Sequence, residues 1–178
     1  MTRALCLTLL LVACAEEPAP DAPTSAASES ERPSDEQGQR LGVPPAQLAR
    51  ARREASGLSH LSPALRRQAL AGQDADDQPS YVALRRDADA HADASVHLRG
   101  RVGLVRPAGE HLWILALMLR REDAGWRDPL YVLSVVEPDA PPEGGALVRV
   151  HGWVVGERTI GRHALPLVLA YAVEPEPE

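Results

Sequence analysis

The spacing of apolar residues changes from a helical to a strand-like period near Ser95. Before this point the chain predicts three short helices, the first two of which are bracketed by helix-starting prolines and helix-ending glycines. The first predicted helix opens at Pro44-Pro45 and runs to about Ala55. The second begins at Pro63, with Ser62 as the N-cap, and is closed by Gly72, and the third runs from Gln78 or Pro79 to about Ala92. Ser56-Gly57 is expected to end the first of them.

After Ser95, apolar and polar residues alternate, as they do in half-buried strands. Val96, Leu98, Val102 and Leu104 have one parity, whereas His97, Arg99 and Arg101 have the other. Gly100 and Gly103 within this first strand predict a strong bend. The turn is expected at Pro107-Ala108-Gly109, and the later strands at residues 112–119, 129–136, 146–155 and 165–173.

The segment from Leu112 to Leu119 is apolar throughout, so its pattern also fits a buried helix. Its short length and the turn signals on both sides, at Gly109 and at residues 123–125, favour a strand. Five strands in about 80 residues, the first long and bent, predict a small closed barrel. The expected fold class is mainly β, a five-stranded barrel preceded by short helices and a disordered N-terminal tether.

The two helices before residue 73 are locally cationic. Six arginines face a single acidic residue, Glu54; they are Arg40, Arg50, Arg52, Arg53, Arg66 and Arg67. One interpretation is contact with anionic lipid or an acidic partner. The other, which we favour, is a solvated helical pair in a linker, with a thin apolar stripe of leucines. Helices this short are marginal alone, so they either dock on the barrel or fray.

The N-terminus has the layout of a signal peptide: Arg3, an apolar run from Ala4, and small residues before Cys14. The tetrapeptide Leu11-Val12-Ala13-Cys14 resembles the lipobox of bacterial lipoproteins. The resemblance implies lipidation of Cys14 and cleavage before it, and Ala15 after the cysteine implies the outer membrane, facing the periplasm. A plain signal peptide or an uncleaved anchor remains the alternative.

Amino-acid composition indicates where the N-terminal tether ends and the folded part of the chain begins. Residues 15–39 are rich in Ala, Pro, Ser and acidic side chains and contain no large apolar residue, so we expect them to be disordered. The expected domains are a signal peptide (1–13), a tether (14–39), short helices and linker (40–78), the barrel (79–174) and a tail (175–178). The two cysteines, Cys6 and Cys14, leave no disulfide in the processed monomer.

Two strands carry a further resemblance. The stretches from Val96 to Val102 and from Val148 to Gly156 are similar to the first and fourth strands of an OB-fold, as in tRNA-anticodon-binding-like OB domains of bacterial envelope proteins. The resemblance covers about Pro79 to Val173 and includes the helix before the first strand. Residues 137–145 are too short and too rich in proline for the usual helix between strands three and four. An OB-like sandwich or another five-stranded barrel therefore stays open.

The resemblance implies a candidate binding patch, because the first and fourth strands are neighbours in an OB barrel. If the valines point inward, the alternating polar residues point outward side by side; they are His97, Arg99, Arg101, Arg149, His151 and Trp153. Guanidinium groups donate to anions and an indole offers a stacking surface. The alternative is an ordinary solvated barrel exterior, or a face covered by an N-terminal helix.

No catalytic constellation, phosphate-binding loop or zinc-spaced histidine pair is present in the sequence, so no enzyme, cofactor or metal site is expected. The expected function is that of a lipid-anchored binding module for an anionic small molecule, glycan or peptide. The alternative is an interaction or scaffold subunit of an envelope assembly. Nucleic acid is expected to be an unlikely partner, because the domain is close to charge-balanced and poor in aromatic residues.

Overall fold

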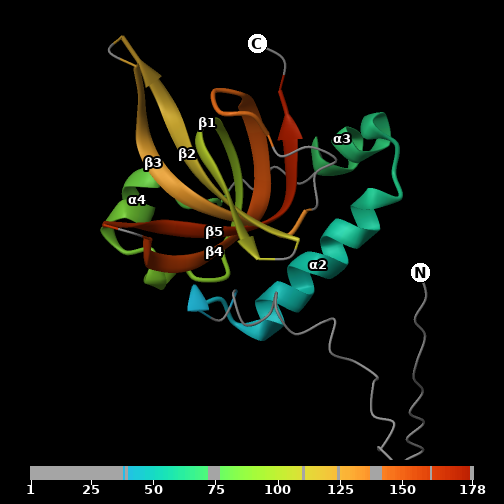
Figure 1. Ribbon diagram of the computed structural model, residues 1–178, viewed down its shortest axis with the longest axis horizontal. Helices are drawn as coiled ribbons and strands as arrows, with labels where there is room; N and C mark the ends of the chain where they lie inside the picture. The colour runs from blue at the N-terminus through green and yellow to red at the C-terminus, as the bar shows by residue number, and fades with distance from the viewer. Residues whose placement is uncertain are drawn as a thin grey trace, which may run out of the picture.

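Five strands close into a barrel in the computed structural model of this chain (Figure 1). They are β1 (Ser95–Gly109), β2 (Leu112–Glu122), β3 (Gly125–Ser134), β4 (Leu147–Ile160) and β5 (His163–Pro175). The order around the barrel is β1-β2-β3-β5-β4, and β1 pairs with both β2 and β4. Only the β3–β5 pair is parallel. The structure describes residues 38, 40–71, 77–109, 111–123, 125–136, 142–160 and 162–176.

This topology confirms the predicted fold class and the strand assignment of residues 112–119. The first strand is longer than expected, since Pro107 pairs with Trp113 and Gly109 with Leu112. The predicted turn at Pro107-Ala108-Gly109 is therefore wrong, and these residues end β1. The third strand also begins earlier than predicted, at Gly125, and the fourth runs on to Ile160.

Gly103 lies at a shift of register between β1 and β2, where the pairing jumps from Val102 to Leu104. An extra residue in one strand reverses the faces of the side chains that follow it. Val102 is accordingly fully buried inside the barrel, whereas Leu104 is 40 % exposed on the outside. The prediction that both residues share one face is wrong for this reason.

The barrel interior is filled by aliphatic side chains from all five strands and by Leu84 and Ala88 from the segment before β1. The helix predicted to run to about Ala92 is shorter, comprising α4 (Tyr81–Arg86) and a separate 3₁₀ turn (Asp89–His91). Asp87 interrupts it, because its carboxylate accepts a hydrogen bond from the Ala90 amide at 3.0 Å and so caps the following turn.

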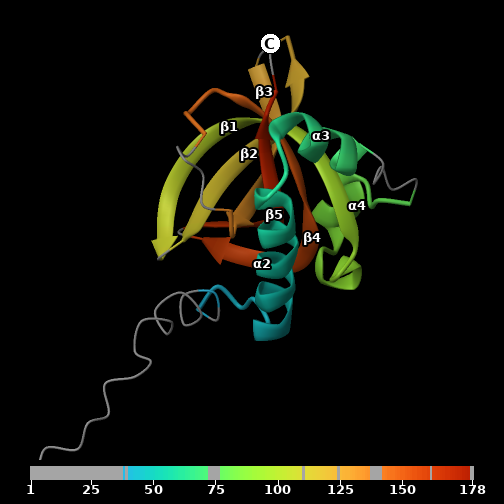
Figure 2. The same cartoon turned by 90° about the vertical axis from the view of Figure 1, so that its right-hand side faces the viewer.

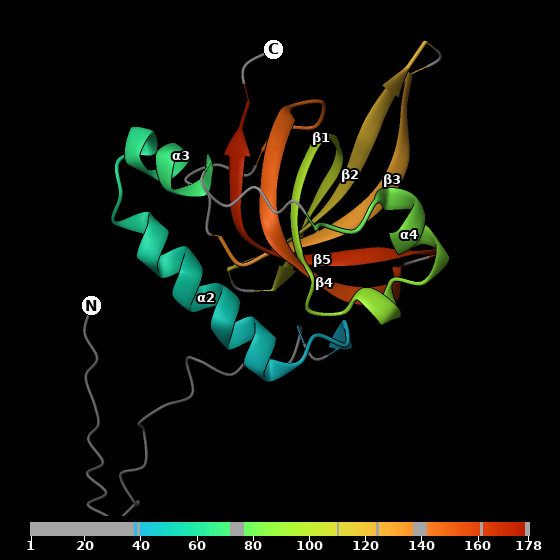
Figure 3. The same ribbon diagram turned by 180° about the vertical axis from the view of Figure 1, so that it is seen from behind.

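Two N-terminal helices lie against the outside of the barrel (Figures 2 and 3), and a second apolar core is buried beneath them. The helices are α2 (Pro45–Ser59) and α3 (Pro63–Ala71). Leu48 and Ala51 of α2 and Leu70 of α3 are buried with Leu167, Leu169 and other residues of the strands. Of the two expected outcomes, docking on the barrel or fraying, the structure shows docking.

The helix α2 continues past the predicted stop at Ser56-Gly57. Ala55 and Leu58 pack partly buried against the second core, and this contact offsets the helical cost of Gly57. No helix occurs among residues 135–136 and 142–146, the described part of the connection between β3 and β4. Among all described residues, no helix is both long and apolar enough to cross a bilayer.

Candidate ligand-binding face at the barrel end

The residues proposed from sequence as a binding patch lie on the outer face of neighbouring strands. In the β1–β4 ladder His97 stands opposite His151, Arg99 opposite Arg149, and Ser95 opposite Trp153. The valines between them, including Val96 and Val150, are buried inside the barrel. The structure therefore gives these strands the orientation that the alternation predicts.

Half of this face is covered. His151 is 1 % exposed and Trp153 is 6 % exposed, and Arg50 of α2 lies 4.0 Å from the centre of the Trp153 ring. Tyr171 of β5 packs against Trp153 with ring centroids 4.7 Å apart, and burial raises the pKa of the Tyr171 hydroxyl. The rings of His97 and His151 are also 4.7 Å apart. Because the faces of Trp153 are taken by Arg50 and Tyr171, we leave it out of the proposed ligand site.

The other half of the face is exposed and carries arginines. Arg99 donates from Nε to Oε2 of Glu176 at 2.6 Å, and Arg149 donates from an η nitrogen to Oε1 of the same carboxylate at 3.2 Å. The hydrogen bond from Arg99, together with the charges of both arginines, lowers the pKa of the Glu176 carboxyl. Arg101 donates from Nε to the carbonyl oxygen of Gly145 at 2.9 Å, which fixes its guanidinium beside the β1–β4 pair.

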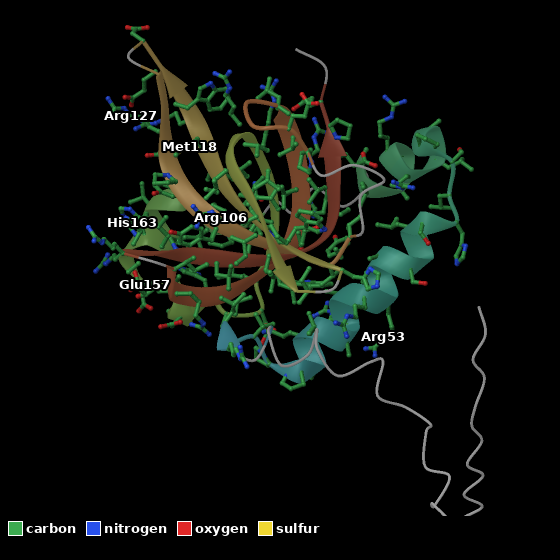
Figure 4. All side chains as sticks on the ribbon, viewed as in Figure 1. Arg53, Arg106, Met118, Arg127, Glu157 and His163 are labelled. Atoms are coloured by element: carbon green, nitrogen blue, oxygen red, sulfur yellow. The ribbon has the colours of Figure 1, made fainter. Side chains whose placement is uncertain are left out.

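A pocket of about 580 Å³ opens between these arginines and the β2–β3 hairpin. Arg99 and Arg101 line it from β1, Leu147 from β4, and Trp126 from the start of β3. The hairpin projects beyond the barrel at upper left in Figure 1, with Arg127 labelled near its end in Figure 4. We call this cavity the hairpin pocket.

Sequence reasoning did not single out Trp126. Its neighbours Gly125 and Arg127 show no strand alternation, because this part of β3 extends past the barrel and has no buried face. The available signal was an aromatic residue directly after a turn, in a chain with only three tryptophans. The hairpin pocket thus combines two guanidinium groups and one indole.

The acidic lining of the hairpin pocket is partly neutralised within the hairpin. Glu122 forms ion pairs with Arg120 at 2.8 Å and Arg127 at 3.8 Å, and Arg120 also contacts Asp128 at 3.0 Å. These side chains are exposed apart from Asp128, which is partly buried, so the pairs of Glu122 are weak. The charge of Glu122 is offset locally, which leaves Arg101 as the cation that no described carboxylate pairs with in the pocket.

A second pocket, of about 320 Å³, lies on the other side of the arginines. Arg67 and Leu70 line it from α3, Arg149 and His151 from β4, and Glu176 after the end of β5. We call it the α3 pocket. The bridge from Arg99 through Glu176 to Arg149 joins a lining residue of the hairpin pocket to two lining residues of the α3 pocket.

Metal-binding side chains do not gather anywhere in the described part of the chain: no three His, Cys, Asp or Glu residues there are arranged to hold an ion. The predicted lipidation site, Cys14, lies outside the described residues, as do the signal peptide and most of the tether.

Comparison with known proteins finds similarity among solved structures. No family model matches the sequence, and no curated protein matches it. Among solved structures, the N-terminal domain of a PriB protein from Thermoanaerobacter tencongensis matches with 20 % identity and a TM-score of 0.34. The match covers 47 % of this chain and 97 % of that domain.

One expectation is corrected here. We predicted from charge balance that nucleic acid is an unlikely partner, and that exclusion does not hold for a barrel of this kind. OB-fold barrels include proteins that bind single-stranded nucleic acid through stacking and a modest cationic groove. Charge balance over the whole domain does not report on one local groove, so the exclusion is withdrawn. The chain has the five-stranded closed barrel of an OB-like fold, with strand order β1-β2-β3-β5-β4.

Proposed function

We propose that this chain is a non-catalytic binding module that recognises an anionic small molecule, glycan or peptide in the hairpin pocket. The observation that supports this proposal is the joint presence of Arg99, Arg101 and Trp126 around one cavity of about 580 Å³. Cavities of this size accommodate small ligands or a few residues of a longer one.

The chemistry of the lining favours a ligand with an anionic group next to a flat or apolar part. Guanidinium groups donate charge-assisted hydrogen bonds to carboxylates, sulfates and phosphates. The indole of Trp126 supplies a flat surface for stacking, and Leu147 adds an apolar wall. Asp123 at the hairpin tip would disfavour ligands carrying dense negative charge on that side.

A thermal-shift screen tests the proposal. The probes are a nucleotide, a sulfated glycan, an acidic peptide and a single-stranded oligonucleotide, each measured at low ionic strength. At least one of the first three is expected to raise the Tm of the native protein and to have no effect on the double variant Arg99→Ala/Arg101→Ala. Arg53→Ala removes an exposed arginine from α2 and serves as the control, because Arg53 does not line the pocket.

The proposal would be contradicted if none of the probes shifts the native protein, or if the double variant responds like the native protein. A shift from the oligonucleotide alone would assign the pocket to nucleic acid instead.

We further propose that the module is held at the bacterial outer membrane, facing the periplasm, by lipid on Cys14. The support is the lipobox-like sequence Leu11-Val12-Ala13-Cys14 after an apolar run. Two or more acyl chains on one cysteine anchor a protein stably, whereas one chain does so only weakly. Mass spectrometry of the mature N-terminus tests this: an acylated cysteine is expected, and an unmodified thiol would remove the anchor.

The alternative function, a scaffold subunit docked through an apolar surface, gains less support. The exposed large apolar side chains among the described residues are Leu65, Val82 and Leu104. They belong to α3, α4 and β1, and so to three separate elements. The outer face that could have formed a flat apolar patch, on β3, β4 and β5, is covered by α2 and α3. We therefore give preference to the ligand-binding module.

A further inference from the structure

Arg99 and Arg149 are held opposite each other by the β1–β4 ladder. Two like charges at directly opposed positions of neighbouring strands repel each other. An anion between them relieves this repulsion, and the carboxylate of Glu176 fills this role. One of its oxygens lies 2.6 Å from Arg99 Nε and the other lies 3.2 Å from an η nitrogen of Arg149.

Glu176 reaches the two guanidinium groups from an extended segment that follows β5. The backbone amide of Glu176 donates to the carbonyl oxygen of Leu147 at 2.9 Å. Two residues earlier, Glu174 stands opposite Arg149 in the register of the β4–β5 ladder. A carboxylate presented by an extended backbone is therefore the chemistry that this pair of arginines accommodates. The same carboxylate lies where the hairpin pocket meets the α3 pocket, because Arg99 lines the first and Glu176 lines the second.

We infer that Arg99 and Arg149 form a carboxylate subsite of the binding face, that Glu176 occupies it as an internal competitor, and that a carboxylate of an extended acidic peptide replaces Glu176 when the ligand binds. This inference rests on the proposed binding function and assigns the peptide as its ligand class. The exchange swaps one carboxylate for another and breaks no covalent bond.

The bridge is suited to such an exchange. Both arginines are well exposed, with 62 % of the Arg99 side chain and 48 % of the Arg149 side chain open to solvent. Exposed ion pairs are individually weak, so an incoming carboxylate can displace one without unfolding the barrel. The only backbone hydrogen bond described for Glu176 is the one to Leu147, so release of the tail leaves the β4–β5 ladder intact.

The alternative is that the bridge only fastens the end of β5. A competing carboxylate and a purely structural bridge differ in the effect that Glu176→Gln has on peptide affinity. Isothermal titration with a peptide of alternating glutamate and proline is therefore compared for the native chain, Glu176→Gln and Glu174→Gln. The last variant removes the same charge two residues away and leaves the bridge in place.

If the Glu176 carboxylate competes with the ligand, its removal strengthens binding of the acidic peptide. Glu176→Gln is expected to bind the peptide about two- to fivefold more tightly than the native chain, the range that corresponds to one exposed ion pair. Glu174→Gln is expected to bind like the native chain. A carbon-detected NMR titration should also show the pKa of Glu176 returning toward its usual value when the peptide is bound, which a purely structural bridge would not do.

Equal affinities of Glu176→Gln and Glu174→Gln, or a Glu176 pKa that stays lowered with peptide bound, would overturn the inference. The proposed function would survive that result if another anionic probe still depends on Arg101 and Trp126. Failure of every probe to bind either the native chain or Glu176→Gln would remove both.

Discussion

Arg50 on α2 lies 4.0 Å from the centre of the Trp153 ring on β4, and this contact fastens an N-terminal helix to the barrel wall. A guanidinium over an indole is attractive because the ring face is electron-rich. The same contact removes Trp153 from solvent. It therefore separates the outer face of the β1–β4 pair into a covered aromatic part and an exposed arginine part, and only the second is open to a ligand.

Docking of α2 predicts that its apolar residues contribute to global stability. Leu48→Ala is expected to lower the free energy of unfolding by about 2–5 kcal/mol, the usual cost of truncating a buried leucine. Leu48 is 2 % exposed in the second core, whereas Leu65 on α3 is 54 % exposed. Leu65→Ala serves as the control and should change the free energy by less than about 0.5 kcal/mol. Urea denaturation measures both, and equal effects would contradict docking.

Replacement of two glycines by alanine is expected to change the stability of the fold in opposite directions. A Cβ on Gly152 would overlap the carbonyl oxygen of Leu169 on β5, so Gly152→Ala must push two paired strands apart. We expect a loss of about 3 kcal/mol, the upper range of overpacking costs. A Cβ on Gly57 in α2 meets nothing within 4 Å, and Gly57→Ala should stabilise by about 0.5–1 kcal/mol. Thermal unfolding of the two variants checks the pair, and a tolerated Gly152→Ala would contradict the close strand approach.

The bridge at Glu176 predicts a pH dependence with a defined sign. Because the pKa of Glu176 is lowered in the folded chain, its charged form is favoured there, and the bridge stabilises the fold above the usual carboxyl value of 4.5. This contribution is lost as the pH falls below 4.5 and through the lowered folded-state pKa. The native chain should therefore be more stable than Glu176→Gln near neutral pH and lose this advantage in acid. A stability difference that does not vary with pH would contradict the assignment.

Because an indole lines the hairpin pocket, ligand affinity is expected to depend on the size of the ring at position 126. Trp126→Ala should weaken binding of a ligand with a flat or apolar part by about 1 kcal/mol or more, since stacking on an aromatic ring is worth this much. Trp126→Phe keeps a smaller ring and should restore part of the affinity. Titration calorimetry with whichever probe binds the native chain measures both. Identical affinities for the three proteins would exclude Trp126 from the ligand contact.

Much of the fold could be predicted because its strands are half-buried or bounded by turns. The alternation in β1 and β4 identified which side chains point outward, and the flanking turns distinguished Leu112 to Leu119 from a helix. The reversal at Gly103 was not predictable from parity, because a bulge changes the face without changing the sequence pattern. Docking of α2 was left open, since a short stripe around Leu48 does not indicate which surface it covers.

The candidate site was predictable only in part. Alternation brought Arg99 and Arg149 together, but it did not reveal that Trp153 is covered by α2. Trp126 was missed because its part of β3 extends past the barrel, where strand periodicity is lost. Glu176 was missed because an acidic, proline-punctuated tail is typical of a solvated end, and its contacts with Arg99 and Arg149 depend on where β5 stops.

The central claim is that a ligand enters the hairpin pocket, and the indole NH signals of the three tryptophans test it most directly. Trp126 lines the pocket, Trp113 packs against the barrel interior, and Trp153 lies beneath Arg50. Titration of the ¹⁵N-labelled protein with a binding anionic probe should shift the Trp126 signal, together with the Nε–H signals of Arg99 and Arg101, and leave the Trp113 and Trp153 signals in place. A bound probe that leaves Trp126 unshifted would contradict the account.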